Sequence, residues 1–460
     1  MKKLSLRSVI MLFIAAIFVL GLCIFCGIYV SSSADWTTYQ GNHRLYSNGE
    51  FVGAGKITDI AGTTLAETKD GKRIYNSSYT TRISTLHAVG DTRGFINTGV
   101  QSAFREKLSG YNLFTGLFGT NTGYCDMQLT INADVSAAAL NALGNHAGTV
   151  GLYNYKTGEL LCMVSSPTFD VNNAENIYAA QGKGYEGVFI NRFLGATYAP
   201  GSTFKIVTAM AAVETFSDAY TRTYNCKGEC TIGGEQVKCT GYHGDIKLEK
   251  AFAVSCNCYF SQLAVDLGKK TMTRYAEKFG FNKKYYLEGM PAAVSSYDVG
   301  DARTIQLGWS GIGQYNDMQN PLQYLTSVGG VANGGTPIKP YFIKKIKNAY
   351  GITTYRGGKQ SGTRVCSKDT AEKLEKLMRG AVEITYGAYF FGDLTVCGKT
   401  GTAEVDKRIP HAEFVGFCTD EEYPFAFIVV AEEGGSGNDL AKSIANSTLQ
   451  AAKRYYDSKE

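Results

Sequence analysis

The longest hydrophobic run of the chain lies close to its amino terminus. It extends from Val9 to Val30 without a charged residue, and its 22 residues are enough to cross a bilayer as a helix, for which about 20 suffice. Three basic residues precede the run, and the first acidic residue, Asp35, follows it. Because positive charge stays on the cytoplasmic side, we expect residues 9–30 to be a transmembrane anchor, residues 1–8 a cytoplasmic tail and the remaining chain extracytoplasmic.

A cleaved signal peptide is the alternative interpretation of this run. Ser32-Ser33-Ala34 is an acceptable cleavage site. The apolar core of a signal peptide is usually about 7–15 residues long, however, and this run is longer. The pattern therefore favours a retained, single-pass anchor.

Residues 35–124 differ in composition from the rest of the chain. They are polar, rich in Gly, Thr, Ser and Tyr, and lack long helical periodicity apart from a helical stretch near Gly99–Leu108. This pattern predicts a small, mostly β module between the anchor and a larger domain, residues 125–460.

Residues 125–460 combine helical and strand patterns. Two apolar strands around Lys156-Thr157-Gly158 predict a hairpin, and several strands near the carboxyl end precede a last helix. The expected strands are 129–132, 149–155, 159–166, 394–402, 414–418 and 425–432. The expected helices are 133–143, 202–216, 249–254, 258–267, 271–279, 320–331 and 439–455. This order predicts a mixed α/β (α+β) fold with an antiparallel sheet flanked by helices.

The expected helix 202–216 carries the first candidate chemistry. It opens with Ser202 after a Pro-Gly turn, and Lys205 follows on the same helix face. The helix is apolar nearly all round, so it should be buried, and burial lowers the pKa of a lysine. A serine beside an uncharged amine is an activated nucleophile, although a serine at this position is more often a simple helix cap. Ser202 and Lys205 are therefore the candidate nucleophile and base.

A second motif, Ser255-Cys256-Asn257, separates two of the predicted helices. A break between helices turns side chains towards a cleft. Ser255 is then a candidate proton relay, and Asn257 a candidate ligand for a substrate amide or carbonyl. The alternative is that the two residues only cap the second helix.

The third motif, Lys399-Thr400-Gly401-Thr402, ends an apolar strand. Lys399 and the hydroxyls of Thr400 and Thr402 are candidates to hold a substrate carboxylate. Gly401 leaves room for a substrate backbone beside the strand. Backbone N–H groups of Ser202 and Thr402 are candidates for an oxyanion hole.

The three motifs follow one another in the order found in penicillin-recognising serine enzymes. Their flanks resemble the class B, monofunctional penicillin-binding proteins, from about Asp126 to the carboxyl end. The segments that carry the resemblance are 151–159, 163–167, 198–205, 331–335 and 399–404. The resemblance is fainter before Asp126, where His87-Ala88-Val89-Gly90 is similar to part of the family's pedestal domain.

This resemblance implies peptidoglycan D,D-transpeptidase activity, with no cofactor. Ser202 would attack the penultimate D-Ala carbonyl of a stem peptide, release the last D-Ala and pass the acyl group to the amine of a neighbouring strand. β-Lactams would acylate the same serine. The resemblance also implies work at the membrane, in many relatives beside a glycan polymerase of the SEDS type.

Two segments depart from the pattern of the family. Gly311–Asp317 (GIGQYND) stands where relatives often carry Gln-Gly-Gln, or Gly-Gln plus threonine, and Glu413 stands where an aromatic residue is common. Neither departure removes a catalytic group, so we expect both to bear on substrate preference.

Other functions remain open at this stage. A D,D-carboxypeptidase would hydrolyse the same acyl-enzyme, and a non-catalytic penicillin-binding sensor or scaffold would keep the fold. A class A β-lactamase is disfavoured, because no Glu-x-x-x-Asn pattern follows Asn257 within about 50 residues. A formal net charge of only +5, without a dense basic run, argues against nucleic acid as a partner.

A cysteine cluster has the spacing of a zinc site. Cys226, Cys230, Cys239 and His243 follow one another as C-x3-C-x8-C-x3-H. The alternatives are plain thiols or a Cys226–Cys239 disulfide that closes a glycine-rich hairpin, and an extracytoplasmic location favours the disulfide. Cys256 is expected to be a small packing residue. The preferred prediction is therefore no metal, with zinc as the less favoured alternative.

Overall fold

The computed structural model describes residues 2–39, 41–111, 124–404 and 409–459. Residues 112–123 of the predicted amino-terminal module lie outside this description.

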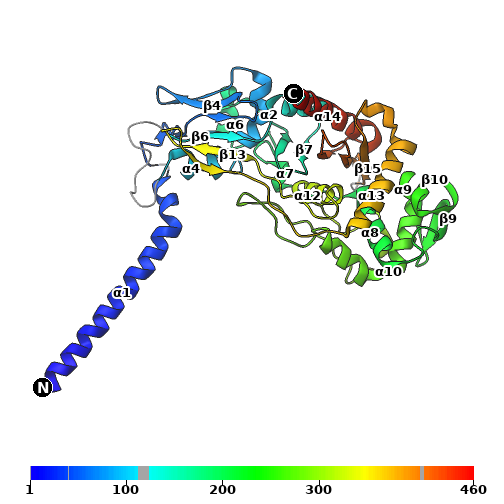
Figure 1. Ribbon diagram of the computed structural model, residues 1–460, viewed down its shortest axis with the longest axis horizontal. Helices are drawn as coiled ribbons and strands as arrows, with labels where there is room; N and C mark the ends of the chain where they lie inside the picture. The colour runs from blue at the N-terminus through cyan, green and yellow to red at the C-terminus, as the bar shows by residue number, and fades with distance from the viewer. Residues whose placement is uncertain (1, 40, 112–123, 405–408, 460) are drawn as a thin grey trace.

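The amino-terminal helix α1 (Lys2–Thr37) contains the whole expected anchor, residues 9–30. It projects away from the rest of the chain (Figure 1). Its large apolar side chains, such as Leu12 and Phe18, are exposed. Within the described ranges it is the one helix that is long and apolar enough to cross a membrane. Because so large an apolar surface is unfavourable in water, α1 fits a single-pass membrane anchor.

A six-stranded sheet lies at the end of the molecule from which α1 projects (Figure 1). Its order is β14-β13-β6-β3-β4-β5; β3 pairs with β6 in parallel, and the other neighbours are antiparallel. The strands are β3 (Ile57–Thr58), β4 (Thr64–Lys69), β5 (Lys72–Tyr75), β6 (Asp126–Leu129), β13 (Ile343–Lys347) and β14 (Thr353–Arg356). Residues on both sides of position 124 therefore share one hydrogen-bonded sheet.

The second sheet is five-stranded and antiparallel throughout, in the order β15-β16-β17-β7-β8. Its strands are β7 (Gly148–Asn154), β8 (Leu160–Ser166), β15 (Val396–Ala403), β16 (His411–Cys418) and β17 (Phe425–Ala431). Every residue of β7, β8 and β17 is buried, so both faces of these strands are covered, as their continuous apolar runs require. The helices that contact the sheet include α5 (Ala133–Leu143), α12 (Pro321–Ala332), α13 (Lys368–Ala381) and α14 (Lys442–Asp457).

A long hairpin and several helices form the end of the molecule opposite the six-stranded sheet (Figure 1). The hairpin packs on α10, which carries a non-helical residue at Gly268. The elements here are η2 (Gly201–Phe204), α8 (Lys205–Thr215), β9 (Thr223–Ile232), β10 (Glu235–Lys247), α9 (Leu248–Ala253), α10 (Asn257–Lys278) and α11 (Thr304–Ser310).

Helix α2 (Tyr79–Val89), which packs on α5 and β8, was not predicted. Its sequence is rich in β-branched residues, which are weak helix formers, so tertiary packing stabilises it. Ser78 caps it by accepting a hydrogen bond from the N–H of Thr81. The helical stretch expected near Gly99–Leu108 is confirmed as α3 (Val100–Ala103) and α4 (Arg105–Ser109).

The predicted mixed α/β fold, an antiparallel sheet flanked by helices, is confirmed. The strand expected at 129–132 lies three residues earlier, because Asn132 caps α5, and the helix expected at 271–279 continues α10. The remaining elements are β1 (Tyr46–Ser47), β2 (Glu50–Phe51), η1 (Val171–Asn173), α6 (Glu175–Ala179), α7 (Arg192–Gly195), β11 (Tyr286–Leu287), β12 (Met290–Pro291), η3 (Val382–Tyr386), η4 (Ala388–Phe391) and η5 (Gly437–Ala441).

Candidate active site

Ser202 lies in a tight turn, η2, that leads directly into α8. A contact between Gly201 and Gly313 holds this turn: the N–H of Gly201 donates to the carbonyl of Gly313 at 3.0 Å. A Cβ on Gly313 would lie 2.1 Å from the carbonyl oxygen of Gly201, and both glycines have positive φ. Only glycine fits such a close approach in this backbone conformation, so Gly313 positions the turn that presents Ser202.

Lys205 lies one helical turn after Ser202 and is fully buried. Residues of the first two motifs surround its amine. Nζ lies 2.9 Å from Ser202 Oγ, and it donates to Ser255 O and Asn257 Oδ1 at 2.7 Å each. Ser255 Oγ is 3.1 Å away. The sequence predicts that Ser202 and Lys205 share one helix face. In the structure their two reactive groups are also in contact.

Two causes lower the pKa of Lys205 well below its usual value: burial first, and then the nearby Lys399 cation. An uncharged amine has two N–H donors and one lone pair. Ser255 O and Asn257 Oδ1 accept hydrogen bonds but cannot donate them, so they take the two donors. The lone pair is then left for the hydroxyl of Ser202, which is the arrangement that a general base needs.

Ser255 has a left-handed backbone conformation, with φ +57°, and this separates α9 from α10. Cys256 then caps α10 by accepting from the N–H of Tyr259. Asn257 is held at both ends of its amide, because Nδ2 donates to the carbonyl of Lys238 at 3.1 Å while Oδ1 accepts from Lys205. The predicted helix break is confirmed, and it turns Ser255 and Asn257 towards the serine.

Lys399 approaches Ser255 from the opposite side. Its Nζ lies 3.0 Å from Ser255 Oγ, from the hydroxyl of Tyr386 and from the carbonyl of Thr400. Burial lowers the pKa of Lys399 to about 7. Ser255 Oγ thus lies between two amines, one on each side.

Tyr386 was not identified from the sequence. Its hydroxyl contacts Lys399 Nζ, and it accepts a hydrogen bond from the N–H of Thr400 at 3.2 Å. It reaches the strand from η3, and no motif around it signals this role. Gly313 was likewise seen only as part of an unusual segment.

β15 is an edge strand of the five-stranded sheet, so its outer side is unpaired in the described chain. The sequence interpretation had the space beside Gly401 open for a substrate backbone. In the structure this space is filled. A Cβ there would lie 3.0 Å from the carbonyl oxygen of Pro200 and 3.0 Å from Thr203 Cγ2. Gly401 therefore lets β15 pack against the Ser202 turn, whereas Thr402 is exposed beside it.

The motifs open onto a cleft of about 480 Å³. Its lining includes Ser202, Asn257 and Thr402, together with Gln314 and Tyr315 from the first of the two unusual segments. Glu413, the second departure, does not line it.

Glu413 is buried behind β15, where Gln319 Nε2 donates to Oε2 at 2.6 Å. Burial raises the pKa of Glu413 well above its usual value. Of the two departures, therefore, only the first faces the cleft. Glu413 does not line the cleft, so the structure does not support the expectation that Glu413 bears on substrate preference.

The cysteines of the cluster are free thiols, which is one of the alternatives that the sequence left open. All twelve cysteines lie among the described residues, and each is a free thiol, so the Cys226–Cys239 disulfide is absent. Cys226, Cys239 and His243 do come together, but the fourth member is Cys256 and not Cys230. The spacing could not show this, because Cys256 comes from the start of α10, beyond the hairpin.

Three comparisons with known proteins bear on this site. Residues 148–450 match the family model of the penicillin-binding protein transpeptidase domain. The peptidoglycan D,D-transpeptidase PbpA of Mycolicibacterium smegmatis is 29% identical over 397 residues, which cover 78% of this chain and 80% of the relative.

Solved structures agree with these two matches. A D,D-transpeptidase domain from Eggerthella lenta has a TM-score of 0.77 at 26% identity and covers 87% of this chain and 98% of its own. Penicillin-binding protein A of M. tuberculosis, in a ceftriaxone acyl-enzyme complex, has a TM-score of 0.77 at 25% identity with the same coverage. The fold, the motif geometry and the family match together assign the chain to the penicillin-binding protein transpeptidase family.

Proposed function

We propose that this chain is a membrane-anchored serine D,D-transpeptidase that cross-links peptidoglycan stem peptides through an acyl-enzyme on Ser202. The observation that carries the proposal is the buried amine of Lys205, 2.9 Å from Ser202 Oγ, with both of its N–H donors engaged elsewhere. Relatives named as peptidoglycan D,D-transpeptidases, and related structures solved as β-lactam acyl-enzymes, support the same activity.

Acylation begins with attack by Ser202 on the penultimate D-Ala carbonyl. The bond from Oγ to the carbonyl carbon forms as the hydroxyl proton moves to Lys205 Nζ. The backbone N–H groups of Ser202 and Thr402 stabilise the oxyanion that develops. The C–N bond then breaks and the last D-Ala leaves.

Ser255 is the proton relay in this step. Its Oγ lies 3.1 Å from Lys205 Nζ and 3.0 Å from Lys399 Nζ, so it can carry the proton from Lys205 towards the departing amine. In the second half-reaction, the amine of a neighbouring stem peptide attacks the acyl-enzyme, and the proton it loses restores the hydroxyl of Ser202.

The third motif holds the substrate. The exposed hydroxyl of Thr402 and the hydroxyl of Thr400 bind the terminal carboxylate, and the Lys399 cation stabilises that negative charge. Asn257 orients the stem peptide through its amide. β-Lactams present a carbonyl and a carboxylate of similar spacing, so they acylate the same serine.

The proposed location follows from α1. Residues 9–30 anchor the chain, residues 1–8 face the cytoplasm, and the cleft faces the wall. A membrane glycan polymerase of the SEDS type is the proposed partner, because it would supply the new strands that this site cross-links.

One assay separates the proposal from its alternatives. The full chain in detergent is incubated with a stem peptide that ends in D-Ala-D-Ala and with an excess of an acceptor amine, and the products are identified by mass spectrometry. We expect a cross-linked product and free D-Ala. Hydrolysed peptide alone would identify a carboxypeptidase, and labelling by penicillin without any product would identify a sensor or scaffold.

The rate of acylation by penicillin should pass through a maximum as pH rises. Lys205 must be neutral to accept a proton, and its pKa is lowered, so activity rises as pH passes that value. Lys399 is cationic only below its pKa of about 7, so activity falls as pH increases beyond it. The second-order rate constant, measured across pH with a fluorescent penicillin, reports these free-enzyme values.

The matched variant for this profile is Lys399→Arg. A guanidinium stays charged throughout, so the variant should be slower but should lose the decline on the alkaline side. A wild-type rate that keeps rising well above pH 7 would contradict a role for the Lys399 charge.

A further inference from the structure

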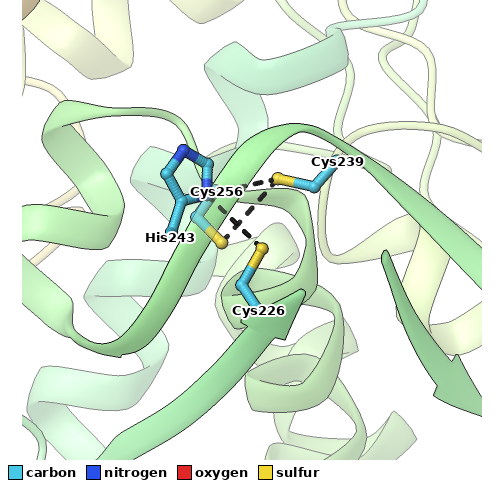
Figure 2. A group of neighbouring side chains, drawn as sticks. All are labelled: Cys226, Cys239, His243 and Cys256. Carbon is cyan, nitrogen blue, oxygen red and sulfur yellow. Dashed lines mark hydrogen bonds between the residues drawn. The ribbon is translucent and has the colours of Figure 1, made fainter. Parts of the chain in front are cut away.

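Four side chains beside the active site converge on one point. Figure 2 shows Cys226, Cys239, His243 and Cys256 pointing towards one another. Their ligand atoms, three sulfurs and one imidazole nitrogen, all lie within 4.8 Å of one another. They come from three separate elements: β9, β10 and the residue that caps α10. This convergence is a tertiary feature, since the chain must fold before the set exists.

Three of the six distances between these atoms match those of a tetrahedral metal site. Tetrahedral zinc, with bonds of about 2.3 Å to sulfur and about 2.0 Å to nitrogen, separates two sulfurs by about 3.8 Å and sulfur from nitrogen by about 3.5 Å. Cys239 Sγ lies 3.8 Å from Cys256 Sγ. His243 Nδ1 lies 3.4 Å from Cys226 Sγ and 3.6 Å from Cys239 Sγ. The other three pairs of ligand atoms are no more than 4.8 Å apart, so the four atoms are close enough to share one ion.

We propose that Cys226, Cys239, Cys256 and the Nδ1 of His243 bind one Zn²⁺. Three thiols and one imidazole are an established donor set for zinc, and four protein ligands leave no open position, so the site is structural and not catalytic. Binding releases the three thiol protons, and the imidazole coordinates in its neutral form. A bound ion explains why these four side chains converge better than a disulfide or simple packing does.

The backbone around the sulfurs supports this assignment. The N–H of Asn257 donates to Cys239 Sγ at 3.3 Å, and the N–H of Tyr259 donates to Cys256 Sγ at 3.4 Å. Hydrogen bonds of this kind orient metal ligands and stabilise the charge on a thiolate.

The site also joins two parts of the active cleft. Cys256 lies between Ser255 and Asn257, the relay and the substrate ligand of the proposed mechanism. Cys239 belongs to β10, the strand whose Lys238 carbonyl accepts from Asn257 Nδ2. Zinc would therefore tie the hairpin to the loop that carries both catalytic groups. This second role rests on the proposed function, whereas metal binding does not.

The metal content of the full chain tests the proposal. The chain is purified in detergent without added reductant or chelator, and its metals are measured by elemental analysis. We expect one zinc per chain, and a tetrahedral thiolate spectrum when Co²⁺ replaces it. A chain that neither contains nor takes up zinc would overturn the proposal, and so would a disulfide between any two of the three cysteines in the chain as isolated.

Variants identify the ligands. Cys256→Ser and His243→Gln should each lose most of the bound zinc. Cys230→Ser is the matched control, because Cys230 lies in the same hairpin, is half-buried like His243, and is not a member of the converging group. It should keep one zinc. If Cys230→Ser lost its zinc while His243→Gln kept it, the proposed ligand set would be overturned. Should Cys256→Ser fail to fold, His243→Gln still tests the ligand set.

A chelation experiment tests the second role. Removing the metal from the wild-type chain should slow acylation by a fluorescent penicillin about tenfold or more, and added Zn²⁺ should restore the rate. An unchanged rate in the metal-free chain would refute the link to the cleft and leave the zinc site standing. A chain that binds zinc but is never acylated would refute the proposed function alone.

Discussion

Replacing Ser202 with alanine is expected to abolish covalent labelling by a fluorescent penicillin while the fold survives. The Oγ atom is the only part of the side chain that forms the acyl bond, and backbone contacts between Gly201 and Gly313 hold the turn that carries the half-buried Ser202. Labelling is read from a denaturing gel, and folding from a thermal melt.

The control for this variant is Ser436→Ala. Ser436 begins the segment Ser436-Gly437-Asn438, which has the same pattern as the second motif, but Ser436 itself is exposed at the start of η5 and does not line the cleft. Its replacement should leave labelling unchanged. Label that persists in Ser202→Ala would remove the nucleophile from the proposed mechanism.

Lys205→Met should slow acylation by about 10²–10⁴-fold, the range that a positioned general base contributes. Methionine has a similar length and is apolar, so it fills the buried space without an amine. Its cost to the fold is the loss of two part-buried hydrogen bonds, to Ser255 O and Asn257 Oδ1, at no more than about 1–3 kcal/mol for each acceptor left unpaired. Stopped-flow acylation rates measure the effect on chemistry, and a denaturant titration measures the effect on stability.

Lys156→Met is the matched control for Lys205→Met. Lys156 belongs to Lys156-Thr157-Gly158, a copy of the third motif in the turn between β7 and β8. It is exposed and distant in the fold from the Ser202 turn, so its loss should leave acylation unchanged. A Lys205→Met chain that acylates at the wild-type rate would show that another group accepts the proton.

The sequence was informative where the signal is local. Ser202 and Lys205 are three residues apart on one helix, so their contact follows from helix geometry and from the apolar surroundings of the helix. The break at Ser255 and the run of apolar strands near the carboxyl end are local patterns of the same kind, and the structure confirms them.

Long-range contacts were not predictable in the same way. Tyr386 reaches Lys399 across a turn, and Gly313 meets Gly201 from a distant loop, with no pattern around either residue. Cys256 was interpreted as a packing residue because its partners lie on a hairpin that only the folded chain brings near. Helix α2 was missed because packing, and not propensity, stabilises it.

The six-stranded sheet has a consequence for how far the enzyme reaches. β3 of the amino-terminal module lies in the middle of that sheet, hydrogen-bonded to β6 on one side and β4 on the other. A shared sheet behaves as a rigid spacer, whereas a polar linker would behave as a slack tether. The distance from the amino-terminal module to the cleft is then set by the fold itself and not by the length of a linker.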